Sequence, residues 1–256
     1  MKINIEEAKE EFIKYTENFN TKDKNVKRKQ QHSIRVMKIA EQIATNLKLS
    51  EEQIQLATLI GLLHDIGRFK QYTDIGLGNN LEGFDHGDYG TKLLFKEGLI
   101  RKFIETNKYD EIIKKSIKNH NKFSIEAGLT QEELLFAKLI RDADKTDIFY
   151  LLIIGEEKTI WETDNMNNEI VTNEIYREFI ENKHINYKNI ETSGDILVAH
   201  FAYIYYLYFK PTLRIFKDKR YIDQLYNRFN FTNKDTAEKF KVIHEKAKQY
   251  IEEKGW

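Results

Sequence analysis

A single proline, Pro211, occurs in the 256 residues of the chain. Proline interrupts helices because it lacks a backbone N–H and clashes with the preceding turn, so its scarcity permits long helices. Apolar residues recur with the helical period through most of the chain, and no segment alternates apolar and polar residues convincingly. The sequence therefore predicts an all-α fold. The predicted helices cover residues 5–18, 25–48, 51–66, 88–105, 108–120, 131–154, 169–181, 194–209, 212–228 and 233–253.

Two of the predicted helices begin with the pattern of a capping box. Ser50 is followed three residues later by Gln53, and Thr130 by Glu133. At this spacing the first and last side chains satisfy backbone amides of the first helical turn reciprocally. These positions are therefore predicted as helix starts.

Basic and acidic residues are balanced, with 41 of each. Sequence-independent binding to nucleic acids needs an excess of positive charge, so no nucleic-acid polymer is expected as a partner. The absence of cysteine excludes thiol catalysis and thiolate metal sites. The first residues lack the apolar run of a signal peptide, and the longest apolar stretch, residues 196–209, is too short to span a bilayer. A cytoplasmic protein without a membrane partner is expected.

Glycines gather in one part of the chain, where five of the twelve lie within residues 71–90. This stretch is predicted as a loop instead of a regular helix; loops of this length are usually functional or disordered, and a solvated insertion is the alternative. From about residue 155 the composition shifts toward Asn, Tyr and Phe. Residues 1–155 are predicted to form a helical core. Residues 156–256 are predicted as a helical extension that packs on this core within the same structural domain.

Imidazole and carboxylate groups interrupt the apolar faces of four predicted helices. They belong to His32, to His64 with Asp65, to His120 and to Asp144. A lone histidine in a core commonly bonds to a backbone carbonyl, but a buried carboxylate without a partner costs several kcal/mol. Since hydrophobic packing makes the four faces converge, these groups are predicted to surround a cation.

The expected donors are nitrogen and oxygen atoms without sulfur. Such a set suits Mn²⁺, Fe²⁺, Zn²⁺, Co²⁺ or Ni²⁺. His86, in the glycine-rich stretch, supplies a sixth possible ligand. One or two divalent transition-metal ions are therefore expected as cofactors.

The order of these residues carries a resemblance to a known family. The ordered set comprises His32, His64, Asp65 and Asp144. With its surroundings, residues 62–69 and 141–145, this set resembles the motif of the HD-domain superfamily of metal-dependent phosphohydrolases. The resemblance covers about residues 25–155 and implies an HD-domain-like helical bundle. The Gly-Tyr-Pro signature of the branch that hydrolyses cyclic-di-GMP is absent from the sequence.

The resemblance also implies how the donors are shared between two ions. The first ion would take His32, His64, Asp65 and Asp144, and the second would take His86 and His120 with Asp65 as a bridge. Asp65 would then orient the attacking water, which the ions activate, and it is predicted as a catalytic residue together with Arg68.

Three basic residues are candidates for binding the phosphate of a substrate. Arg68 lies one turn after Asp65, and its planar guanidinium suits a phosphate oxygen, although a surface position at a helix end is the alternative. Lys145 follows Asp144 directly and would contact either the phosphate or a carboxylate such as Asp142. Lys122 is the third candidate, with a solvated side chain as the alternative.

The leading functional hypothesis is a phosphohydrolase that cleaves a phosphate ester of a nucleotide or another small phosphorylated metabolite, using a metal-activated water. The same ordered ligands also resemble the mixed-valent di-iron oxygenases of this fold, such as myo-inositol oxygenase. A non-catalytic module that binds a metal or a ligand is the third possibility. The sequence does not indicate the substrate, the native metal or the oligomeric state.

Overall fold

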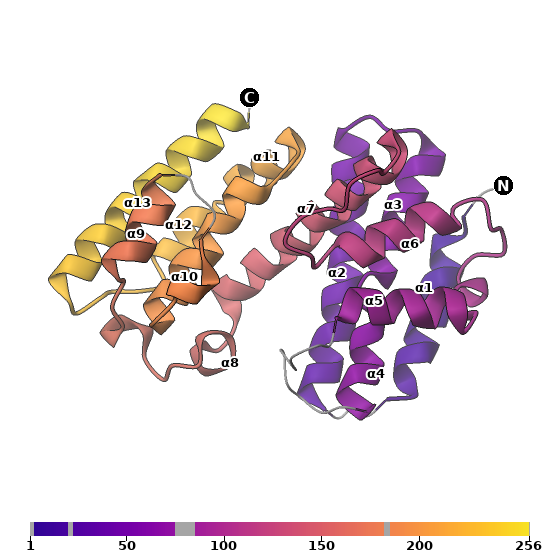
Figure 1. Cartoon of the computed structure of the whole chain (residues 1–256), viewed down its shortest axis with the longest axis horizontal. Helices are drawn as coiled ribbons and strands as arrows, with labels where there is room; N and C mark the ends of the chain where they lie inside the picture. Colours follow the sequence, from indigo (N-terminus) through magenta and orange to yellow (C-terminus); the bar gives the residue numbers. More distant parts are fainter. Residues whose placement is uncertain (1–2, 20–22, 75–84, 182–184, 256) are drawn as a thin grey trace. The chain divides into compact units, whose positions relative to one another are not determined.

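The computed structural model describes residues 3–19, 23–74, 85–181 and 185–255. Every regular element among them is a helix and none is a strand, which confirms the predicted all-α fold (Figure 1). The middle of the predicted glycine-rich loop, residues 75–84, lies outside the described residues. Both ends of that stretch are helical, so the loop is shorter than predicted.

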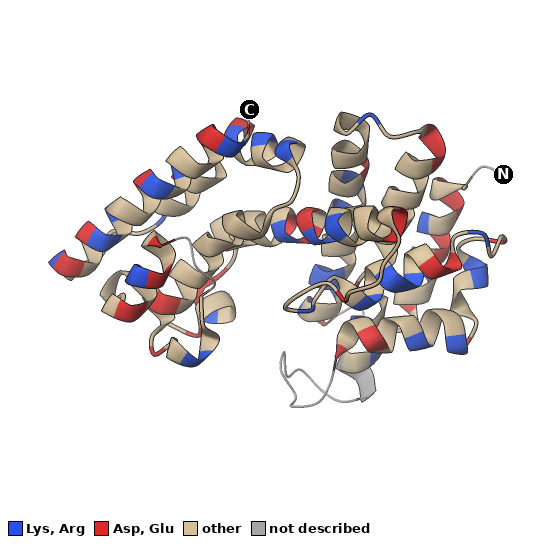
Figure 2. Cartoon of the chain, turned by 45° about the horizontal axis from the view of Figure 1, so that its top comes forward, with Lys and Arg blue, Asp and Glu red and all other residues tan. Residues whose placement is uncertain are grey.

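The chain divides into two compact units, residues 1–147 and 148–256. The division falls within one long helix, whereas the predicted division after residue 155 coincides with the end of that helix. The predicted domain organisation stays a prediction. Figure 2 shows basic and acidic residues interspersed along the helices of each unit.

The first unit is built from helices that cover most of its length. They are α1 (Ile5–Glu17), α2 (Lys24–Asn46), α3 (Glu51–Leu63), α4 (Ile66–Asp74), α5 (His86–Thr91), the π-helical segment η1 (Lys92–Lys96), the 3₁₀ segment η2 (Leu99–Lys102), α6 (Asp110–Asn119) and α7 (Gln131–Ile154) as far as Asp147. The single helix predicted over residues 51–66 is wrong at its end, because α3 stops before His64 and α4 starts after Asp65. Both predicted capping boxes are confirmed by reciprocal hydrogen bonds, at Ser50 and at Thr130.

In the first unit α2 and α3 run side by side in close contact (Figure 1). Gly61 makes this approach possible. A Cβ atom at this position would lie 2.9 Å from the Cα of Met37 and 3.0 Å from the carbonyl oxygen of Val36. Any side chain at residue 61 would therefore push the two backbones apart.

A second close approach joins α4 to α5. A Cβ atom on Gly67 would lie 2.7 Å from the carbonyl oxygen of His86 and 2.8 Å from the amide nitrogen of Gly90. Only glycine fits there without moving α5. Because Gly67 follows Asp65 by two residues, this contact brings the start of α5 close to that carboxylate.

The second unit surrounds an aromatic core of its own, in which Trp161, Phe149 and Phe201 are fully buried. It contains the end of α7, α8 (Glu157–Trp161), η3 (Met166–Asn168), α9 (Asn173–Ile180), η4 (Tyr187–Asn189), α10 (Ser193–Phe201), η5 (Ala202–Tyr206), α11 (Lys210–Asp218), α12 (Tyr221–Tyr226) and α13 (Lys234–Lys254). Pro211 lies in the first turn of α11, where its missing N–H costs no helical hydrogen bond.

Within the part of the chain that the structure describes, no helix has both the length and the apolar character needed to cross a membrane.

Candidate metal centre

Two histidines meet where α2 packs against α3. The Nε2 atoms of His32 and His64 lie 3.2 Å apart, and both side chains are buried. His64 follows the last residue of α3, and its Nδ1 lies 2.8 Å from the carbonyl oxygen of Gly61. A proton on Nδ1 therefore donates to that oxygen, which leaves the lone pair of Nε2 directed toward His32. Gly61 thus permits the close packing of the helices and also orients one of the imidazoles.

Asp144 from α7 completes a first group of donors. Its Oδ1 lies 3.1 Å from Nε2 of His32 and 3.6 Å from Nε2 of His64. One donor atom from each of the three residues lies within 4.8 Å of the others. This group can hold a metal ion.

A second pair of imidazoles comes from α5 and α6. The Nε2 atoms of His86 and His120 lie 3.1 Å apart. His86 is the first residue of α5, and His120 follows the last residue of α6. The Nδ1 of His120 lies 2.6 Å from the carbonyl oxygen of Ile117, so His120 is oriented by the turn before it, as His64 is.

Asp65 lies between the two pairs and faces each with a different oxygen. Its Oδ2 is 3.6 Å from Nε2 of both His32 and His64. Its Oδ1 is 3.5 Å from Nε2 of His86 and 3.6 Å from Nε2 of His120. Oδ1 is buried and makes no hydrogen bond to any described residue. Buried carboxylate oxygens normally have a partner, so a cation between Asp65 and the second pair suits this donor set.

The charges of the centre also suit cation binding. Burial opposes ionisation of Asp65, but the ammonium of Lys29 and the surrounding imidazoles outweigh it and hold the pKa of this carboxyl well below its usual range. Burial likewise opposes ionisation of Asp144, and the neighbouring imidazoles of His32 and His64 lower its pKa. Burial lowers the pKa of His86 to about 2. The carboxylates are therefore ionised and His86 is neutral, which are the protonation states of metal ligands.

Lys29 is one of the residues at the centre that the sequence analysis missed. Its Nζ lies 2.8 Å from Oδ2 of Asp65. Lys29 precedes His32 by one helical turn on α2, so both side chains leave the same face of the helix. This spacing of one helical turn from a predicted ligand could have identified Lys29 in the sequence.

Asp147 and Arg35 were missed as well. Oδ2 of Asp147 lies 2.6 Å from Nδ1 of His32, and Arg35 donates to both oxygens of Asp147. Burial and the ammonium of Lys29 oppose protonation of His32, yet its hydrogen bonds with Asp144 and Asp147 raise its pKa. Asp147 follows Asp144 by one turn, so helical spacing was a signal here too.

The three basic residues predicted to bind substrate lie in different surroundings. Nε of Arg68 is 3.9 Å from Oδ1 of Asp65, so Arg68 lies at the centre. Lys145 is partly buried, and burial lowers its pKa to about 8. The ammonium of Lys122 is paired with Asp85 at 2.6 Å and with Asp88 at 2.7 Å. Lys122 thus lies in a partly exposed cluster with two carboxylates, and neither a phosphate contact nor a solvated side chain is tested.

Arg141 anchors the turn that follows His120. Its guanidinium is buried and donates to the carbonyl oxygens of Asn119 at 2.8 Å and of Lys122 at 2.6 Å. Those carbonyls lie on either side of His120 in the sequence. Arg141 therefore fixes the backbone that carries one ligand of the second pair.

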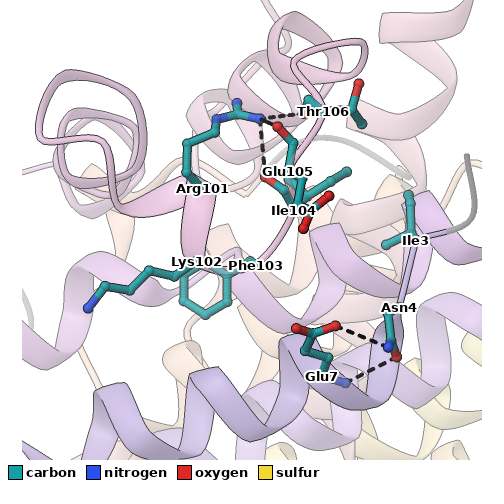
Figure 3. Close-up of a pocket in the computed structure, with 9 residues that line it drawn as sticks. All are labelled: Ile3, Asn4, Glu7, Arg101, Lys102, Phe103, Ile104, Glu105 and Thr106. Atoms are coloured by element: carbon teal, nitrogen blue, oxygen red, sulfur yellow. Dashed lines mark hydrogen bonds between the residues drawn. The ribbon is translucent and has the colours of Figure 1, made fainter.

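A pocket of about 250 Å³ elsewhere in the first unit contains none of the predicted site residues (Figure 3). Arg101 lines it, and its guanidinium donates to the carbonyl oxygens of Ile104 and Thr106 and to Asp110. The guanidinium of Arg101 thus stabilises the segment that follows η2. This pocket offers no cluster of metal donors.

The helices and the centre together define an all-helical protein with histidines and aspartates arranged to hold divalent ions. Residues 30–148 match the family model of the HD domain, a domain of metal-dependent hydrolases, so this segment of the chain is an HD domain. The match confirms the resemblance inferred from the sequence, and the six predicted donors all lie within the matched segment. No curated protein and no solved structure matches the chain significantly. The structure brings the six donors together, while their binding of metal stays a prediction.

Proposed function

We propose that the chain is a metal-dependent phosphohydrolase that hydrolyses a phosphate ester of a nucleotide or another small phosphorylated metabolite. The observation that carries this proposal is the position of Asp65, whose two oxygens face two separate pairs of imidazoles. This arrangement is the one expected of a carboxylate that bridges two cations.

Each half of the centre offers donors for one ion. The first half would use His32, His64, Asp144 and Oδ2 of Asp65, and we call it the Asp144 half. The second would use His86, His120 and Oδ1 of Asp65, and we call it the His86 half. A pair of divalent ions bound there supplies an activated water and neutralises the charge of a phosphoryl group. Nitrogen and oxygen donors without sulfur suit Mn²⁺, Fe²⁺, Co²⁺, Ni²⁺ and Zn²⁺.

Two basic side chains beside Asp65 are our candidates for binding the phosphoryl group of the substrate. Lys29 approaches Asp65 from the side of Oδ2, and Arg68 approaches it from the side of Oδ1. Both cations lie in a largely buried site, where water and salt screen their charges little. We propose that each binds a non-bridging phosphoryl oxygen and so orients the phosphorus atom toward the attacking water. Lys145 is a third candidate. Substrate binding by Lys122 stays a prediction, and in the structure its ammonium pairs with Asp85 and Asp88.

The same six donors would also serve a di-iron oxygenase, the alternative considered from the sequence. The positive charges of Lys29 and Arg68 beside Asp65 favour an anionic substrate over a neutral polyol. This difference supports hydrolysis of a phosphate ester as the first candidate.

The proposal is tested with the full chain loaded in turn with Mn²⁺, Co²⁺, Ni²⁺ and Fe²⁺. We expect release of inorganic phosphate, or of a product phosphate from a diester, from at least one member of a panel of nucleotides and aryl phosphates. Chelation should abolish this activity and added metal should restore it. Asp65→Asn should be inactive, whereas the exposed Asp164→Asn should match the wild type. Absence of hydrolysis with every metal, together with O₂ uptake by the iron-loaded chain, would instead support the oxygenase.

A further inference from the structure

Two buried polar atoms of opposite character lie near each other at the centre, and neither makes a hydrogen bond to any described residue. They are Nε of Arg68, which only donates, and Oδ1 of the ionised Asp65, which only accepts. At 3.9 Å they are too far apart to bond to each other. Buried polar groups normally have partners. A metal ion suits Oδ1, and an anionic oxygen of a ligand suits Nε.

The backbone that carries Arg68 is fixed on both sides by its neighbours in α4. Gly67 packs against the backbone of α5. Phe69 is fully buried, and its ring meets that of Phe12 at a centroid distance of 5.6 Å and an angle of 80°. These contacts place the Cα atom of Arg68, but its long side chain still has several rotatable bonds. The direction of the guanidinium therefore depends on a further contact.

Gln71 supplies that contact. It follows Arg68 by three residues on α4, a spacing at which side chains of a helix are neighbours. Nη1 of Arg68 donates to Oε1 of Gln71 at 3.0 Å. Gln71 is buried, although glutamine is mostly an exposed residue and a buried amide costs free energy unless it is hydrogen-bonded. A buried amide oxygen thus accepts from a guanidinium beside the centre.

The shape of the guanidinium makes this hydrogen bond effective. The group is planar and rigid and carries five N–H groups. A bond at Nη1 therefore restricts the orientation of Nε as well, and it uses only one of the five donors. A side chain that is already oriented loses less conformational freedom when a ligand binds.

We propose that Gln71 is a positioning residue for the substrate. It holds the guanidinium of Arg68 so that Nε donates to an oxygen of the phosphoryl group, beside the ion on Oδ1 of Asp65. The inference rests on the proposed function, in which Arg68 binds the phosphoryl group. Gln71 acts only through Arg68.

The test is a double-mutant cycle, because such a cycle separates an effect that passes through Arg68 from a general one. Binding of inorganic phosphate to the full chain at saturating Co²⁺ is measured by calorimetry. Gln71→Met should weaken phosphate binding by about 10-fold when Arg68 is present. In Arg68→Lys, which keeps the positive charge but has no planar group to orient, Gln71→Met should change the affinity by less than about 2-fold.

Gln55→Met is the matched control. Gln55 is also a buried glutamine of the first unit, and its Oε1 accepts from the amide of Ile3 at 3.1 Å. Its replacement likewise removes a buried amide, and it should leave phosphate binding unchanged. If Gln71→Met does not fold, Gln71→Asn takes its place in the cycle. That variant keeps an amide but withdraws it from Nη1 by one methylene group, so it should also weaken binding only when Arg68 is present.

Equal weakening in both backgrounds, or no weakening in either, would overturn the inference. Hydrolysis of phosphate esters by the same proteins keeps it separate from the proposed function. Hydrolysis by the wild type combined with equal weakening contradicts the inference alone. Phosphate binding that needs Gln71 only when Arg68 is present, without hydrolysis of any ester, supports the inference and contradicts the proposed function. Absence of phosphate binding in the wild type contradicts the inference, whereas hydrolysis still decides the proposed function.

Discussion

The ammonium nitrogen of Lys29 lies 2.8 Å from Oδ2 of Asp65, the carboxylate that both pairs of imidazoles share. The Asp65 side chain is 4% exposed and that of Lys29 is 21% exposed, so the ion pair is poorly screened by solvent. Lys29 therefore competes with a metal ion for Asp65. Under the proposed function, a phosphoryl oxygen would become the partner of its ammonium once Asp65 ligates a metal ion.

Replacement of Lys29 by methionine should separate metal binding from substrate binding. In Lys29→Met we expect tighter binding of Mn²⁺, because the competing cation is gone. We expect kcat/KM for the best phosphate ester to fall by about 10–100-fold, the range that corresponds to a hydrogen bond with a charged group. Titration calorimetry and steady-state kinetics measure the two effects. Lys27→Met, an exposed position on the same helix, is the control. An unchanged kcat/KM in Lys29→Met would show that Lys29 does not bind substrate.

Gly67→Ala should damage the His86 half. The new Cβ would meet the backbone of α5 at His86 and Gly90, so α5 must shift away from α4. We expect the free energy of unfolding to fall by about 1–3 kcal/mol, as overpacking in a core usually causes. The stoichiometry of bound metal should fall toward one ion per chain. Gly90→Ala serves as the control, because its Cβ would find only ordinary contacts at 3.5 Å and beyond. Two ions bound as in the wild type would contradict the expectation.

Arg141→Met should destabilise the first unit at the turn after His120. The substitution keeps most of the apolar stem but leaves the carbonyl oxygens of Asn119 and Lys122 without their buried donor. We expect a loss of about 1–3 kcal/mol, the usual cost of an unsatisfied buried polar group. Denaturation by urea measures it, with the exposed Arg177→Met as the control. Equal stability of the two variants would argue against this role of Arg141.

The second unit should lose stability in mild acid because of His200. Burial lowers the pKa of His200 to about 4, and its Nδ1 accepts a hydrogen bond from Trp161. Above the ordinary pKa of about 6.5 His200 is neutral in both states and has no effect on stability. As the pH falls from there toward 4, the unfolded chain takes up a proton that the folded chain excludes, so the free energy of unfolding falls.

The loss through His200 should reach about 3 kcal/mol near pH 4 and then level off. In His200→Gln, which keeps an acceptor for Trp161 but does not titrate, stability should depend less on pH between 4 and 6.5. Chemical denaturation of both proteins across this range measures the difference. Identical pH profiles would show that His200 takes up no proton on unfolding.

Much of the fold followed from the sequence because helical periodicity is a local property. Ser50 and Thr130 marked helix starts, and both were found. The break at His64 and Asp65 was not predicted, because neither residue is glycine or proline and the apolar pattern continues through Ile66. The break lets Asp65 face both imidazole pairs, and it depends on packing between helices that are distant in the sequence.

In the candidate centre, too, local patterns were predictable and contacts between distant helices were not. His32, His64 and Asp144 stood out because each interrupts an apolar stripe, and the structure brings all three together. Lys29 and Asp147 did not stand out, although each lies one turn from a predicted ligand. A charged residue in a sequence is usually solvated, and only tertiary contacts reveal that these two point inward.

The division of Asp65 between two neighbourhoods limits how this centre can be simplified. A derivative that keeps a single ion is reached by substituting His86 or His120, which leaves the other side intact. A substitution at Asp65 changes both sides of the centre, because its two oxygens face different pairs of imidazoles. One of the two proposed ions can therefore be removed selectively only through residues that face one side of Asp65.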